Sequence, residues 1–112
     1  MSKTCLHRIA VKPLSVNDAY IGRRFASPAL KAFKSEMGYL LPKISVPDGK
    51  LSVFYRFGVA SRASDGDNLI KAFQDCLSAQ YGFNDNKIYK WSIEKVLVKK
   101  GEEFIEFSID ML

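Results

Sequence analysis

The sequence predicts a single α+β domain in which two helices pack on a mixed β-sheet. Its 112 residues leave room for one hydrophobic core, and 47% of them are hydrophobic, as is typical of a packed interior. The spacing of the hydrophobic residues changes along the chain between strict alternation, typical of strands, and the longer period typical of helices. In chain order these segments give strand, helix, strand, helix, strand, strand.

The first half of the chain contains one predicted strand and one predicted helix. Thr4–Val11 alternates as a strand. A helix is expected to begin after Ser27, a good N-cap residue, with Pro28 at its first position. Hydrophobic residues then recur on one helix face up to Pro42, which ends the helix because proline lacks a backbone N–H. Gly38 is an alternative, earlier end.

The second half supplies three strands and the second helix. Leu51–Val59 alternates as a half-buried strand, and a helix is expected over Asp67–Gln80, with Gly82 suited to its C-terminal cap. Ile88–Val98 and Phe104–Met111 then form two strands that a tight glycine-containing turn joins.

The charge is unevenly distributed. The net charge is +5, and residues 1–56 carry ten basic and three acidic residues, whereas residues 57–112 carry seven basic and nine acidic ones. A basic half beside an acidic half allows one surface to hold a polyanion while the other supplies carboxylates. Charge alone does not separate a nucleic-acid-binding protein from other small basic proteins.

The cysteine content and the hydropathy exclude several classes of protein. Cys5 and Cys76 are too few for a disulfide framework, and no spacing of Cys and His suggests a zinc site. No segment has the length and apolarity of a membrane span or of a signal peptide. We therefore expect a cytoplasmic protein with no membrane partner.

One segment combines residues suited to phosphodiester chemistry. Asp65 and Asp67 flank Gly66 where a strand ends and a helix begins, so alternate side chains of an extended segment point to the same side. Lys71 follows Asp67 by one helical turn. Asp85 follows the helix, in a loop expected to fold back to the same edge of the sheet. Three converging carboxylates and one lysine are thus the candidate catalytic group.

Such a group of carboxylates needs a cation, because like charges at short distance raise one another's pKa. Mg²⁺ is the expected cation, since it prefers oxygen ligands and is held by a few carboxylates together with water and substrate phosphate. A bound Mg²⁺ polarises a phosphodiester and lowers the pKa of a bound water. Lys71 would stabilise the negative charge that develops during the reaction.

A structural role explains the same residues without catalysis. Ser64 to Asp67 matches a helix capping box, and Asp67 with Lys71 is a common ion pair on a helix surface. Asp85 among asparagines is typical of a turn. The alternative function is therefore a non-catalytic nucleic-acid-binding module.

The longer pattern resembles a known family. The run D-G-D-N-L-I-K-A-F-Q-D-C-L, followed by G-F-N-D-N-K-I, is similar to the signature of RusA-type Holliday junction resolvases. The segment Pro13–Asn17 with Tyr20 looks like the early loop of that family. The resemblance spans nearly the whole chain, residues 1–112, and the acidic run with its spaced third aspartate is its most specific part.

The resemblance implies a function and a set of site residues. Asp65, Asp67 and Asp85 would be the catalytic metal ligands, and Lys71 the catalytic basic residue. Members of the family act as homodimers on four-way DNA junctions, use Mg²⁺ (Mn²⁺ is an alternative) and leave ligatable nicks. A small-molecule cofactor is not expected, and the gene would be bacterial or carried by a phage. A related nuclease acting on other branched DNA is a further alternative.

Two positions depart from the family pattern. Ser64 stands where a basic residue often precedes the first aspartate, with Arg62 two positions upstream. Asn84 precedes Asp85 where a second acid is frequent, although the third carboxylate itself is kept.

Several residues are candidates for DNA binding. Arg23 and Arg24 lie in the predicted loop Pro13–Phe25, where they could hold backbone phosphates, and Asn17 lies in the same loop. Arg62 is positioned to reach a phosphate near the aspartates. These four residues, Asn17, Arg23, Arg24 and Arg62, are the predicted nucleic-acid-binding residues.

Four other residues have competing interpretations. Tyr89 and Trp91 are suited to stacking on bases, but packing in the core or in a dimer is the more usual role of aromatic residues on a strand. Asp75 is expected to pair with Lys71, and Cys76 to be a small buried hydrophobic residue.

Overall fold

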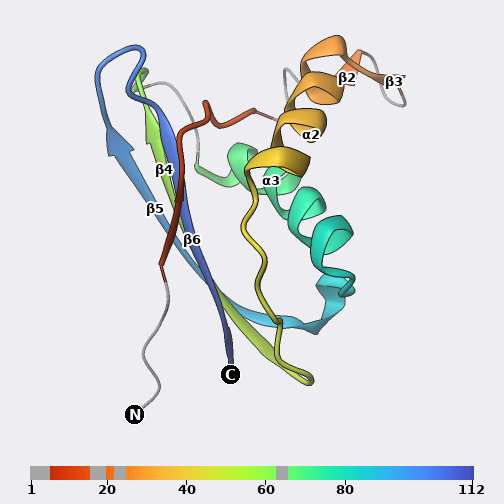
Figure 1. The fold of residues 1–112 in the computed structure, drawn as a ribbon. Coiled ribbons are helices and arrows are strands. Elements are labelled where there is room, and N and C mark those ends of the chain that lie inside the picture. The colour runs from red at the N-terminus through yellow and green to blue at the C-terminus, as the bar shows by residue number, and fades with distance from the viewer. Residues whose placement is uncertain (1–5, 16–19, 22–24, 63–65) are drawn as a thin grey trace.

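The computed structural model describes residues 6–15, 20–21, 25–62 and 66–112 (Figure 1). The chain forms one α+β domain with a mixed sheet, and the predicted order of strands and helices is confirmed. The elements are β1 (His7–Ile9), β2 (Tyr20–Ile21), β3 (Phe25–Ala26), α2 (Pro28–Leu40), β4 (Leu51–Val59), α3 (Gly66–Tyr81), the 3-10 helix η1 (Asp85–Lys87), β5 (Ile88–Leu97) and β6 (Phe104–Met111).

Four strands form the main sheet in the order β1-β6-β4-β5. β4 pairs in parallel with β5 on one side and antiparallel with β6 on the other, and β1 pairs antiparallel with β6. α2 and α3 lie on one face of this sheet, and the opposite face is left open (Figure 1). Over the described residues, no helix combines the length and apolarity needed to span a bilayer.

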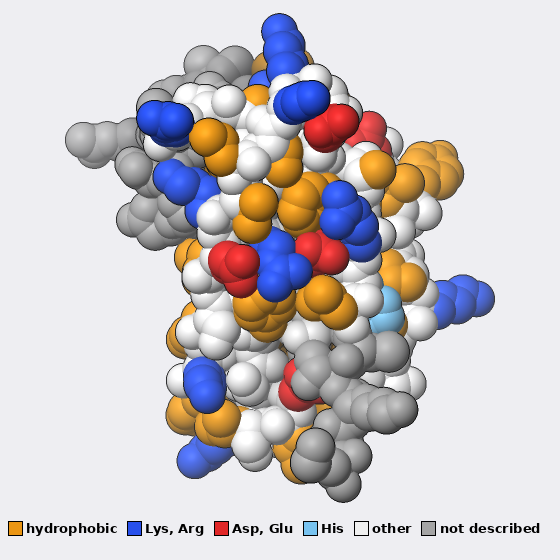
Figure 2. All heavy atoms as spheres, turned by 90° about the vertical axis from the view of Figure 1, so that its left-hand side faces the viewer, with side chains coloured by type: hydrophobic (Ala, Val, Ile, Leu, Met, Phe, Trp, Pro, Cys, Tyr) orange, Lys and Arg blue, Asp and Glu red, His pale blue; other side chains and the backbone are white. Residues whose placement is uncertain are grey.

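The open face of the sheet carries a short row of charges. The guanidinium of Arg56 lies 2.9 Å from a carboxylate oxygen of Glu106 and 3.3 Å from one of Glu94, and Arg8 lies 3.7 Å from Glu106. Figure 2 shows this face, with acidic and basic side chains together at its centre and hydrophobic side chains around them. Opposite charges on neighbouring strands hold the strands in register, although each exposed pair contributes at most about 1 kcal/mol.

Two features of connectivity go beyond the prediction from sequence. The expected turn lies at Lys100 and Gly101, but β5 and β6 are not paired with each other, because β4 lies between them. Alternation of hydrophobic residues predicts a strand but does not show which strand it pairs with. The predicted loop Pro13–Phe25 also contains β2, which pairs with β3 through Tyr20 and Ala26. A two-residue strand is too short for its periodicity to appear in the sequence.

The core is built on β4. Its inward-facing residues are almost completely buried, and two aromatic side chains, Tyr55 and Phe57, stand at its centre. The ring of Phe73, from α3, packs edge-on against Tyr55 at a centroid distance of 5.2 Å and against Phe107, from β6, at 5.4 Å. This edge-to-face geometry is favourable for aromatic rings, so one residue of α3 ties the helix to two strands.

Both helices begin and end close to the predicted residues. The Ser27 side chain accepts a hydrogen bond of 3.1 Å from the backbone N–H of Leu30, and Pro28 is the first residue of α2, as the sequence predicted. α2 continues through Gly38 to Leu40. α3 ends before Gly82, whose φ of +68° is the left-handed conformation that glycine adopts most readily at a helix end.

A polar contact joins β4, α3 and β5. Oε1 of Gln74 accepts one hydrogen bond of 2.9 Å from the hydroxyl of Tyr55 and another of 2.8 Å from the indole N–H of Trp91. Burial raises the pKa of Tyr55, and the negative charge of Asp85 raises it further, so the hydroxyl stays protonated and donates. Gln74 therefore satisfies a buried hydroxyl and attaches β5 to the helix layer.

We expect Gln74→Leu to lower the free energy of unfolding by about 1–3 kcal/mol, because it leaves the buried Tyr55 hydroxyl without an acceptor. Urea denaturation of Gln74→Leu, Tyr55→Phe and the double variant measures this. Adding Tyr55→Phe to Gln74→Leu should recover part of the loss, since it removes the unpaired donor. Additive effects of the two substitutions would contradict this account.

Candidate functional site

The acidic segment lies between the end of β4 and the start of α3. β4 ends at Val59, and α3 begins at Gly66. Asp67 is the second residue of α3, so the expected position of an acidic residue in the first helical turn is confirmed for its backbone. Asp65 lies outside the described residues. Arg62 is described and is exposed.

A hollow of about 170 Å³ lies beside this segment. Its walls come from four parts of the chain: the segment after β1, the end of β4, the first turns of α3 and the loop before β6. The described residues that line it are Lys12, Pro13, Ser15, Val59, Ala60, Ser61, Leu69 and Glu103. The fold thus brings the start of the N-terminal loop next to the acidic segment, although the two are far apart in sequence.

The predicted DNA-binding residues of the N-terminal loop are not themselves described. Asn17, Arg23 and Arg24 lie outside the described residues, and Ser15, on the wall of the hollow, precedes Asn17 by two positions. Lys12 and Ser61 also line the hollow, although they are not among the residues predicted from the sequence. Nothing in their local sequence marks them, because only the folding of β1 beside β6 brings Lys12 to this end of the sheet.

Several cations surround this end of the sheet. Lys71 is exposed, and its Nζ lies 3.3 Å from a carboxylate oxygen of Asp75, which confirms the predicted pairing. Nζ of Lys95, on β5, donates a hydrogen bond of 3.3 Å to the backbone carbonyl of Arg62. Lys95 therefore places the chain that leads to the aspartates beside the end of β5.

Glu103 contributes a negative charge on the rim of the hollow. Hydrogen bonds from the backbone N–H groups of Glu103 and Gly101 lower the pKa of this carboxyl group, and Lys12 and Lys100 lower it further. The Gly101 N–H lies 2.7 Å from Oε1 of Glu103. The carboxylate is thus ionised and turned back toward its own loop.

Asp85 lies at the other end of α3. It opens η1, is exposed, and follows Asn84, whose side-chain oxygen accepts a hydrogen bond of 3.0 Å from the Asn86 N–H. From Asp67 to the last residue of α3, Tyr81, the helix rises about 21 Å at 1.5 Å per residue. Asp85 comes four residues after that end.

The expectation that Asp85 folds back to the end of the sheet at which α3 begins is therefore wrong within one chain. The reason is the parallel pairing of β4 with β5. Ile88, at the start of β5, lies beside Leu51, at the start of β4, whereas the acidic segment follows the end of β4. A helix that connects two parallel strands has to return the chain to the end of the sheet at which the first strand began.

Asp67 and Asp85 lie too far apart to bind one metal ion within a single chain. Ligands of one Mg²⁺ ion lie about 2.1 Å from it, so two ligands lie close to each other. The length of α3 separates Asp67 from Asp85 by a much larger distance. Among the described residues, no group of three His, Cys, Asp or Glu side chains lies close enough to hold a metal ion. One chain by itself therefore does not fit the metal set that the sequence predicts.

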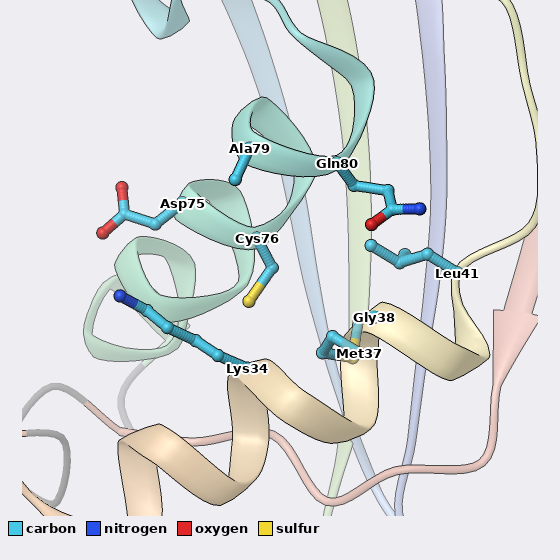
Figure 3. A pocket seen from close by; sticks show the side chains of 8 residues that line it. All are labelled: Lys34, Met37, Gly38, Leu41, Asp75, Cys76, Ala79 and Gln80. Carbon is cyan, nitrogen blue, oxygen red and sulfur yellow. The ribbon is translucent and has the colours of Figure 1, made fainter.

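A groove of about 210 Å³ separates α2 from α3 (Figure 3). Lys34 and Asp75 lie at one end of it and Leu41 and Gln80 at the other, and Cys76 points between the helices. Burial raises the pKa of the Cys76 thiol to about 11, which confirms the expected role as a small buried residue. Because the raised pKa keeps this thiol protonated, and the thiolate is the reactive form, we assign the groove no chemistry.

Comparison with known proteins identifies no relative. No protein-family model matches the chain, and no curated protein matches its sequence significantly. The functional assignment therefore depends on the residues and their placement.

We expect Cys76 to react slowly with iodoacetamide in the folded protein. At pH 8 a thiol with a pKa of about 11 is roughly 0.1% thiolate, the form that reacts. Mass spectrometry of a Cys5→Ser variant, with and without urea, measures the rate at Cys76 alone. Equal rates in the two conditions would contradict the burial of this thiol.

Proposed function

We propose that the protein is a Mg²⁺-dependent, structure-selective endodeoxyribonuclease that cuts four-way junctions or related branched DNA. The observation that carries the proposal is the position of the acidic segment. It joins the end of a central strand to the start of α3, next to a hollow that the N-terminal loop segment also lines. A described core element, β4 or α3, lies on each side of this segment in the sequence.

The shape of the site favours a polymer over an enclosed small molecule. The hollow of about 170 Å³ is smaller than typical pockets for small ligands, which measure roughly 300–1,000 Å³. Exposed cations lie along its surroundings, including Arg62, Lys71 and Lys95. A DNA strand lying across the end of the sheet would contact these groups through its phosphates.

We propose a role for each candidate residue except Asp85, which lies at the other end of α3. Asp65 and Asp67 supply carboxylates for the cation, with Mn²⁺ as an alternative to Mg²⁺. Lys71 stabilises negative charge at the phosphate that is cut, once DNA draws it from its exposed pair with Asp75. Arg62 holds an adjacent phosphate. Asn17, Arg23 and Arg24 extend the DNA contact along the N-terminal loop, and the setting would be a bacterial or phage-infected cytoplasm.

One observation favours the alternative of a non-catalytic binding module. Asp67 lies in the first turn of α3 and Asp85 beyond its last, so helix capping and a turn account for both residues within one chain. The two functions differ in whether the DNA is cut.

The test is cleavage of end-labelled four-way junction DNA in the presence of Mg²⁺ or Mn²⁺, with linear duplex DNA as the control substrate. We expect paired nicks near the branch point by the wild-type protein only. Asp67→Asn and Lys71→Met should each lower the rate by at least about 100-fold, because each removes a charge that acts on the reacting phosphate.

Asp48→Asn is the matched control, since Asp48 is an exposed aspartate in the turn before β4 and belongs to no part of the proposed site. It should cut like the wild type. Binding of the junction without cleavage by the wild-type protein, in both metals, would establish the binding module and overturn the nuclease assignment.

A further inference from the structure

The connection between β5 and β6 passes the end of β4. Because β4 lies between these two strands, residues 98–103 have to cross one strand before β6 begins. The backbone N–H of Val98 donates a hydrogen bond of 2.8 Å to the carbonyl of Val59, the last residue of β4. Phe104, which follows the connection, pairs with Gly58. The connection therefore lies at the end of the sheet from which the chain leaves β4 towards α3 (Figure 1).

The middle of this connection, residues 99–102, forms a turn that we call the lysine turn. The backbone N–H of Glu102 donates a hydrogen bond of 2.9 Å to the carbonyl of Lys99. Gly101 has a φ of +95°, which glycine adopts without strain, and its N–H donates a bond of 2.7 Å to Oε1 of Glu103. Lys99 and Lys100 are therefore neighbours on a backbone of defined shape, and both are exposed.

Further basic residues lie beside the lysine turn. The charges of Lys12 and Lys100 both lower the pKa of Glu103, so Lys12, from the segment after β1, lies close to the turn. Nζ of Lys95 lies 3.3 Å from the backbone carbonyl of Arg62. Together with the turn, these described residues supply the basic side chains Lys12, Arg62, Lys95, Lys99 and Lys100 and the acidic ones Glu102 and Glu103. Positive charge exceeds negative charge among them, which attracts a polyanion.

The chemistry of the lysine turn suits phosphates rather than bases. Single-stranded bases bind proteins largely by stacking on exposed aromatic side chains, and residues 98–103 include no aromatic residue. Phe104 is only 6% exposed, and the guanidinium of Arg8 lies over its ring at 3.9 Å from the centroid. Lysine side chains contact backbone phosphates, which a DNA duplex presents whatever its sequence.

We propose that the lysine turn is a phosphate-binding element that holds a duplex arm of the DNA at this end of the sheet. Lys99 and Lys100 contact backbone phosphates, and Lys12 continues the contact along the wall of the hollow. The inference deepens the proposed function, because it names the part of a branched substrate that is bound here. Binding of the arm does not require that the DNA be cut.

Measurement of binding in EDTA tests the lysine turn without metal-dependent cleavage. Fluorescence anisotropy gives the Kd of a four-way junction and of a linear duplex over a range of salt concentrations. We expect Lys99→Gln/Lys100→Gln to weaken the binding of both DNAs by the same factor, about tenfold at moderate salt. The slope of log Kd against log salt should fall by about 1.8, because each phosphate contact accounts for roughly 0.9.

Lys50→Gln/Lys87→Gln is the matched control. Both lysines are exposed and line one hollow at the other end of β4 and β5, so this variant removes the same charge far from the lysine turn. It should keep the salt slope of the wild type. Lys99→Arg/Lys100→Arg should also keep it, because a guanidinium binds phosphate as well.

Chemical modification locates the contact without any substitution. Acetylation of exposed lysines by an N-hydroxysuccinimide ester, followed by mass spectrometry, measures the reactivity of each lysine in the wild-type protein. Bound linear duplex should slow the acetylation of Lys99 and Lys100 by at least about fivefold, because their ammonium groups contact phosphates. The acetylation of Lys50 and Lys87 should not change.

Four outcomes would overturn the inference. They are an unchanged salt slope in Lys99→Gln/Lys100→Gln, an equal loss of binding in the control variant, a loss confined to the four-way junction, and unprotected lysines in the turn. The nuclease assignment fails separately. A reduced salt slope in a protein that cuts no DNA keeps the lysine turn and rejects the nuclease, whereas metal-dependent cleavage with an unchanged slope does the reverse.

Discussion

β4 is hydrogen-bonded on both sides, in parallel to β5 and antiparallel to β6, and the rest of the structure depends on this double pairing. It fixes which face of the sheet the helices cover, because the alternate residues of β4 that point to α3 are the least exposed in the protein. Phe73 packs on that face against Tyr55 and Phe107. Since close packing is lost when any one of these elements moves, the helix layer and the sheet are stable only together.

The parallel pairing also decides where the acidic residues lie. The crossover through α3 must carry the chain from the end of β4 to the start of β5. The two ends of α3 therefore lie near opposite ends of these parallel strands. Asp67 and Asp85 are separated for this reason alone. The same crossover places β5 at the edge of the sheet, where only β4 pairs with it among the described strands. The separation of Asp67 from Asp85 and the position of β5 at the edge of the sheet thus both result from the parallel pairing of β4 with β5.

Polar contacts attach β5, which has few buried side chains, to the rest of the protein. Gln74 accepts hydrogen bonds from Tyr55 and Trp91 and so attaches the exposed strand β5 to α3. On the open face, Arg56 lies between Glu94 and Glu106 and links β4 to both neighbouring strands. These contacts attach β5 to its neighbours, although its own side chains are largely exposed to solvent.

The sequence by itself determined the element types, the N-terminus of α2 at Ser27 and Pro28, the buried face of α3 and the pairing of Lys71 with Asp75. These features depend on residues close together in the chain, so their periodicity and capping residues can be recognised in a short stretch of sequence. Only the tertiary structure decided that β4 lies between β5 and β6, that Lys12 lines the hollow at the end of β4, and that Asp85 lies beyond the other end of α3. Strands that are far apart in the sequence have similar local patterns, so the sequence does not show which of them pair. The packing of the whole core determines the strand order.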